Sequence, residues 1–134
     1  MEIREVKDLV RNLHIERQDA SGRPETITLE EWTGAVELME GVRMAKGDAA
    51  VTNPLTEQVV TLPNRGGDAE IFREDCHKWL RALFWTPDGM VRFAEPGMAE
   101  DPIIPVASKL ANTLRAHVCD EDGKPYRKAG SQSL

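Results

Sequence analysis

The chain has 134 residues, of which 40% are hydrophobic and 30% charged, and its formal net charge at pH 7 is −6. This length suits one domain with a single hydrophobic core, and the composition excludes an intrinsically disordered chain. The acidic average charge disfavours nucleic acid and anionic membranes as partners, and it attracts basic proteins.

The N-terminal residues are predicted to form a short helix, because the apolar positions over 3–13 follow helical spacing. A strand over 13–18 and a loop over 19–25 come next. The many charges of the first segment do not fit a signal peptide, and no apolar run approaches the roughly 20 residues of a membrane span. We therefore expect a cytoplasmic protein without membrane association, whose two cysteines stay reduced.

The clearest local signal is a helix start. Thr28 and Glu31 have the spacing of a capping box, in which each side chain bonds the backbone amide of the other residue. Ile27 and Trp32 occupy the two positions of a hydrophobic staple around it. The pattern predicts a helix over 29–40 with Trp32 buried in the core.

The middle of the chain is predicted to consist of hairpins, because short β-branched and aromatic runs alternate with turn residues. The sequence Thr86-Pro87-Asp88-Gly89 suits a tight turn, with proline at the first corner and glycine in the last position. The predicted strands of this region cover residues 50–52, 58–62, 69–73, 79–85 and 90–94.

The C-terminal part is predicted to hold a second main helix over 105–115 and a returning strand over 117–119. Together the elements predict an α+β fold: an antiparallel sheet of about four to six strands built from hairpins, with two main helices and the short N-terminal one. We expect a single domain over 1–126 and a disordered tail over 127–134.

Metal binding and catalysis find little support in the sequence. Cys76 and His77 are adjacent, and adjacent side chains rarely reach one ion, although His117 and Cys119 would share one side of a strand. Cys76 also lies among acidic residues, whereas a catalytic thiolate needs an electropositive pocket. We therefore expect no metal, no cofactor and no catalytic residue, and the sequence leans against an enzyme.

The strand over 79–85 is apolar on both faces, with Trp79, Leu83 and Trp85 predicted to point one way. Either the two main helices cover one face each, or one face binds a second subunit or another protein. Acidic residues just before this strand would form the polar rim of such a surface. The candidate partner-binding residues are Asp68, Glu70, Glu74, Asp75, Trp79, Arg81 and Trp85.

The layout of several segments resembles a diffuse group of small, acidic, mostly uncharacterised bacterial proteins, some of which neighbour secreted polymorphic toxins. The residues that carry the resemblance are Ile27 to Trp32, Asn53-Pro54 with Thr56, Phe84 to Phe93, and Cys119 to Gly123 before Tyr126. The resemblance implies an immunity protein that neutralises a toxin.

These observations predict a non-enzymatic, cytoplasmic protein-binding protein, whose partner would be a basic toxin domain. An acidic surface would draw in toxins that are basic because they act on nucleic acid. Two alternatives remain: a small enzyme or ligand-binding protein with its site near Cys76, His77 and Arg81, and a structural homodimer.

Overall fold

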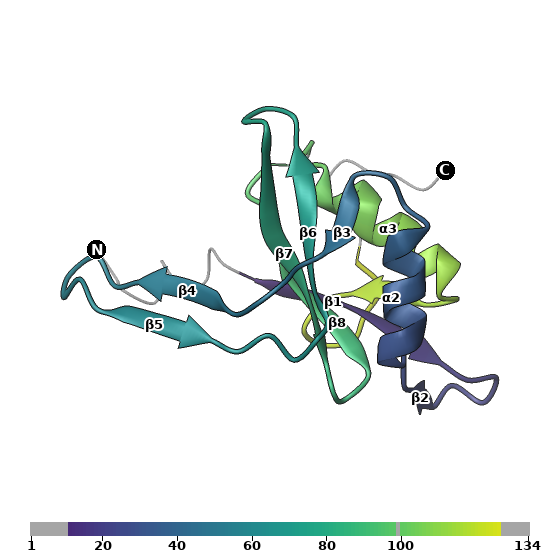
Figure 1. Cartoon of the computed structure of the whole chain (residues 1–134). Helices are drawn as coiled ribbons and strands as arrows, with labels where there is room; N and C mark the ends of the chain where they lie inside the picture. Colours follow the sequence, from purple (N-terminus) through teal and green to yellow (C-terminus); the bar gives the residue numbers. More distant parts are fainter. Residues whose placement is uncertain (1–10, 99, 127–134) are drawn as a thin grey trace, which may run out of the picture.

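The computed structural model describes residues 11–98 and 100–126 of the chain (Figure 1). Within them lie two helices and nine strands, so the predicted α+β class is confirmed. Residues 3–10 of the predicted N-terminal helix lie outside the described part, as does the predicted tail over 127–134. The end of that helix prediction is wrong, because Asn12 and Leu13 already belong to strand β1.

The main sheet is antiparallel and has seven strands in the order β2-β1-β8-β7-β6-β3, with β9 pairing β1. It exceeds the predicted size because the short strands β2 and β3 join it. Its strands are β1 Asn12–Gln18, β2 Pro24–Glu25, β3 Val42–Met44, β6 Asp68–Arg73, β7 Lys78–Thr86, β8 Met90–Ala94 and β9 His117–Cys119.

Helix α2, Leu29–Glu37, begins at the predicted capping box. The Glu31 amide donates to Thr28 Oγ1 at 3.1 Å, and the Thr28 amide donates to Glu31 Oε1 at 3.0 Å. The helix ends earlier than predicted, because the exposed Leu38 is already its C-cap.

Helix α3, Ile103–Thr113, starts two residues before the predicted position. The Asp101 carboxylate accepts a hydrogen bond from the Ile103 amide at 2.9 Å and so satisfies a free donor of the first turn. Pro105 therefore lies inside the first turn, where its missing N–H costs nothing.

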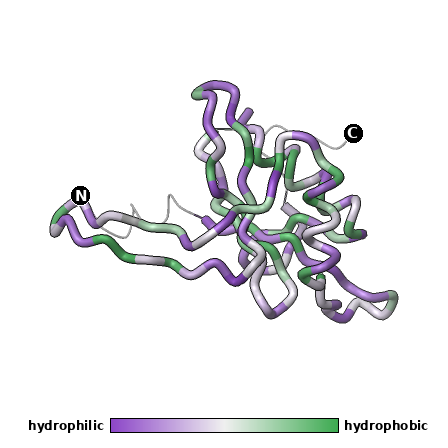
Figure 2. Tube along the Cα trace, viewed as in Figure 1, coloured by the Kyte–Doolittle hydropathy of each residue, from purple (hydrophilic) through white to green (hydrophobic). Residues whose placement is uncertain are grey.

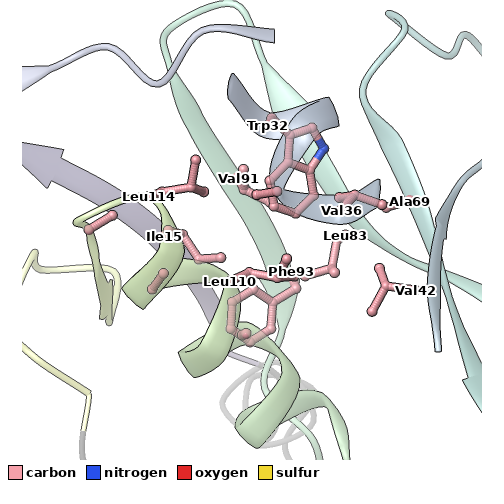
Figure 3. Close-up of a cluster of buried hydrophobic side chains, with 14 of the residues drawn as sticks. Ile15, Trp32, Val36, Val42, Ala69, Leu83, Val91, Phe93, Leu110 and Leu114 are labelled. Carbon is pink, nitrogen blue, oxygen red and sulfur yellow. The ribbon is translucent and has the colours of Figure 1, made fainter. Parts of the chain in front are cut away.

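Both helices pack on the same face of the main sheet and share one hydrophobic core with it (Figures 1 and 3). Trp32 and Val36 of α2 lie beside Leu110 of α3, over Leu83 and Phe93 of the sheet. Trp32 is fully buried, as predicted. The alternative in which the helices cover one face each is therefore wrong, and the opposite face, called the open face below, carries neither helix.

Strands β4, Ala49–Thr52, and β5, Val59–Leu62, form a separate two-stranded antiparallel sheet. This hairpin, called the arm below, projects from the main sheet on the side away from the helices (Figure 1). Both of its strands were predicted from the sequence. Figure 2 shows hydrophobic residues at several positions along β5, within the part of the hairpin that projects from the main sheet.

Candidate partner-binding surface

A β-bulge in β7 decides which side chains reach the open face. Ala69 of β6 opposes Leu83, whereas the next residue, Glu70, opposes Arg81. Ala82 therefore has no partner residue in β6 and is the extra residue of the bulge. A bulge reverses the alternation of side chains along the strand beyond it. Leu83 therefore points into the core, and Arg81 points to the open face with Glu70.

The predicted grouping of Trp79 with Trp85 is consequently wrong. Trp85 lies on the helix side, opposite the buried Val91, and its indole Nε1 donates to the Ile27 carbonyl at 2.9 Å. Trp79 opposes Phe72, which follows the core residue Ile71 and so faces the other way. The side chains of the two tryptophans thus lie on opposite faces of one strand.

Trp79 is the centre of an aromatic and charged cluster on the open face. The Arg43 guanidinium carbon lies 4.1 Å from the Trp79 ring centroid, which is a cation–π contact. Arg43 Nε also donates to Glu70 Oε1 at 2.7 Å, and the Phe72 ring lies 5.4 Å from the Trp79 ring. Because this cluster is half-exposed and already ordered, it offers a partner a rigid surface.

Arg81 fixes the base of the arm to the main sheet. Its Nη1 donates to Asp68 Oδ2 at 3.0 Å and to the Gly47 carbonyl at 3.0 Å, and its Nη2 donates to the Lys46 carbonyl at 3.2 Å. Asp68 and Arg81 have only 9% and 17% of their side chains exposed. These two predicted partner-binding residues are therefore occupied with each other and with the residues that lead into β4.

Most carboxylates of the predicted acidic rim form ion pairs with arginines. Asp68 and Glu70 are paired with arginines, which leaves the turn between β6 and β7 as its exposed part. In that turn Glu74 and Asp75 are exposed, and a hydrogen bond from Arg73 lowers the pKa of Asp75 below its usual value.

Cys76, His77 and Arg81, the residues of the predicted alternative site, line neither of two clefts on the described surface, although one cleft borders the turn that holds Cys76 and His77. Cys76 and His77 are exposed in the turn between β6 and β7, and Arg81 is held at the base of the arm. The clefts have volumes of about 650 Å³ and about 340 Å³. The larger lies between α2, the end of α3 and the β1–β2 hairpin. The smaller lies between the start of α3 and residues 72–75, at the end of β6 and in the turn that also holds Cys76 and His77.

The larger cleft is lined by an ion pair rather than by groups poised for chemistry. Arg17 donates from Nη2 to Glu31 Oε1 at 2.8 Å and from Nη1 to Oε2 at 2.9 Å. This bidentate bond is the main reason that the pKa of Glu31 is lowered to about 2. Glu31 also closes the capping box of α2, so both charges already have structural partners.

A second group of polar side chains on the sheet was not recognised from the sequence. His14, Glu16 and Cys119 bring their ligand-type atoms within 4.8 Å of one another. Burial, and then the neighbouring Glu16, raise the pKa of Cys119 to about 12, so its thiol is protonated at neutral pH. The sequence carried a signal for this group, because His14 and Glu16 alternate along one strand as His117 and Cys119 do along another.

The chain matches no protein-family model, no curated protein and no solved structure. Among the described residues, no helix is long and apolar enough to cross a membrane. The fold itself defines a class: an α+β domain with helices on one face of an antiparallel sheet and an open face flanked by a projecting arm.

Proposed function

We propose that this protein is a non-enzymatic, cytoplasmic protein-binding protein that binds its partner through the arm and the adjoining open face. The observation that carries the proposal is the exposure of apolar side chains on the arm. Val60 and Leu62 alternate along β5 and so share one face, with 50% and 49% of each residue exposed. Val59 is 64% exposed on the opposite face of the ribbon.

An isolated two-stranded ribbon is marginally stable in water, because it cannot bury a hydrophobic face of its own. A partner that packs on Val60 and Leu62 would supply that missing layer. Phe84, 36% exposed, and the Trp79 cluster continue the apolar surface onto the open face. Aromatic and arginine side chains of this kind commonly dominate binding energy.

The most concrete form of this function is immunity to a bacterial toxin, and the expected partner is a basic toxin domain. The formal net charge of −6 supports a basic partner, because opposite charges accelerate association. Among the predicted partner-binding residues, Trp79 and the exposed Glu74 and Asp75 keep a direct role. Asp68 and Arg81 act by holding the arm in position, and Glu70 by holding Arg43 over Trp79.

The experiment measures binding kinetics against a candidate toxin domain, taken from a reading frame next to the gene of this protein. Changing Val60 and Leu62 together to Asp should raise the dissociation rate by about tenfold or more, the loss typical of a binding hot spot. Leu38→Asp is the control, because Leu38 is 83% exposed at the C-cap of α2, on the helix side of the sheet. Its dissociation rate should equal that of the unchanged protein.

Two results would count against the proposal. Equal loss of binding in the control would place the partner on the helix side. A chain that sediments alone as a dimer, and becomes a monomer in the arm variant, would favour the homodimer alternative.

A further inference from the structure

Four side chains of metal-ligating type gather on the open face where β1 and β9 lie side by side. In the antiparallel ladder His14 opposes Cys119, and Glu16 opposes His117. The flanking residues Leu13 and Ile15 are fully buried in the core, so His14 and Glu16 face the other way. Cross-strand partners share a face, which brings all four side chains to one patch.

Three of the four are already close together and shielded from water. The candidate ligand atoms of His14, Glu16 and Cys119 lie within 4.8 Å of one another, and His14 Nε2 is 3.0 Å from Glu16 Oε1. His14 is 8% exposed and Cys119 5% exposed. His117 is exposed and opposes Glu16 across the ladder, so it flanks these three residues on the same face.

These distances fit a small tetrahedral ion after a modest contraction. Zinc bound at about 2.0–2.3 Å to nitrogen, oxygen and sulfur requires ligand atoms about 3.3–3.6 Å apart. Changes of side-chain torsion cover the remaining difference, because the strands that hold the residues are already in register. Thiolate, imidazole and carboxylate together suit zinc, whereas calcium and magnesium prefer oxygen ligands alone.

The sequence led us to expect no metal, but from this arrangement we propose that the patch binds one divalent ion such as zinc, with His14, Glu16, Cys119 and His117 as its ligands. On binding, the Cys119 S–H bond breaks, the sulfur–metal bond forms and one proton leaves to solvent. The thiolate and the Glu16 carboxylate then balance the two charges of the ion. Arg92 lies across the ladder from His14, and its positive charge would repel the ion. Its ion pair with Asp88 reduces this repulsion.

The site would tie the last strand of the sheet to the first. β9 has three residues and pairs with β1 alone among the named strands. An ion bridging the two strands would stabilise the folded chain, since metal binding energy adds to folding energy. This inference goes beyond partner binding and is independent of it, because the arm contributes none of the ligands.

The test is a titration of the purified full chain with Co²⁺, which takes zinc sites and reports a bound thiolate by a charge-transfer absorption band. We expect one Co²⁺ per chain, tetrahedral visible bands and competition by Zn²⁺. Cys119→Ser should remove the charge-transfer band, whereas Cys76→Ser, the matched control in an exposed turn, should keep it. His117→Ala should weaken the affinity for Co²⁺ by about 10–100-fold or more. A loss of that size is typical when a residue that only supports a metal ligand is removed, and His117 is proposed as a ligand itself.

A wild-type chain without the band at excess Co²⁺, or a band that survives in Cys119→Ser, would overturn the proposal. Unchanged affinity in His117→Ala would overturn the four-ligand site. Far-ultraviolet circular dichroism checks that each variant is folded. Glu16→Gln, which keeps the size of the side chain, serves as a second ligand variant, and unchanged Co²⁺ affinity in it would also contradict the proposed site.

Discussion

The interaction of Arg81 with Asp68 allows a quantitative test of how the arm is held. Arg81→Met removes one hydrogen bond to a carboxylate and two to backbone carbonyls but keeps most of the apolar stem. Breaking a buried ion pair by removing one partner costs about 3–5 kcal/mol. Because Arg81 keeps 17% exposure, we expect a loss near the lower limit, about 3 kcal/mol.

The assay is urea unfolding followed by tryptophan fluorescence, in a double-mutant cycle with Asp68→Asn. The two changes should be non-additive by about 1–2 kcal/mol, as expected for residues in direct contact. Arg92→Met is a suitable control, since the side chains of the Arg92–Asp88 pair are 44% and 46% exposed. The loss of such a surface pair should stay below about 1 kcal/mol. Additive effects of Arg81→Met and Asp68→Asn would refute the role given to this pair.

Three further predictions concern the framework. Trp32→Ala should reduce the free energy of unfolding by about 3–5 kcal/mol, since the indole is fully buried and donates to a backbone carbonyl; a loss below ~1 kcal/mol in urea would contradict the packing. Gly89→Ala should cost about 1–3 kcal/mol in thermal unfolding, because φ is +90° and the new Cβ would lie 2.7 Å from Thr26 Cα. The pKa of Glu31 falls from 4.5 to about 2 on folding, so its stabilisation is complete above pH 4.5 and is lost as the pH falls toward 2. Glu31→Gln should therefore flatten the pH dependence of stability in that range, and an unchanged profile would refute the Arg17 bond as its cause.

The local features of the fold were predictable because their signals lie within a few residues. The Thr28–Glu31 capping box and the turn before Gly89 both appear as expected, since each depends on contacts between near neighbours. Pro105 misled the prediction of where α3 begins. Asp101-Pro102 is an equally local signal, and it marks the true start, because the Asp101 carboxylate accepts from the Ile103 amide.

The functional surface was less predictable, since it depends on the pairing of distant strands. The bulge at Ala82 reverses the side-chain alternation of β7, and alternation in the sequence alone places Trp79 and Trp85 together. The pairing of His14 with Cys119 joins strands from opposite ends of the chain. Placement of both helices on one face is likewise a property of topology rather than of either helix sequence.

Hydrogen exchange measured with and without the toxin domain tests the central claim, that the arm and the open face bind the partner. In the free protein the amides of β4 and β5 should exchange quickly, because the arm buries few apolar side chains. In the complex we expect slowed exchange over Ala49–Thr52, Val59–Leu62 and Lys78–Thr86, with α2 and α3 unchanged. Protection confined to α2 and the end of α3, with the arm still exchanging quickly, would contradict the account.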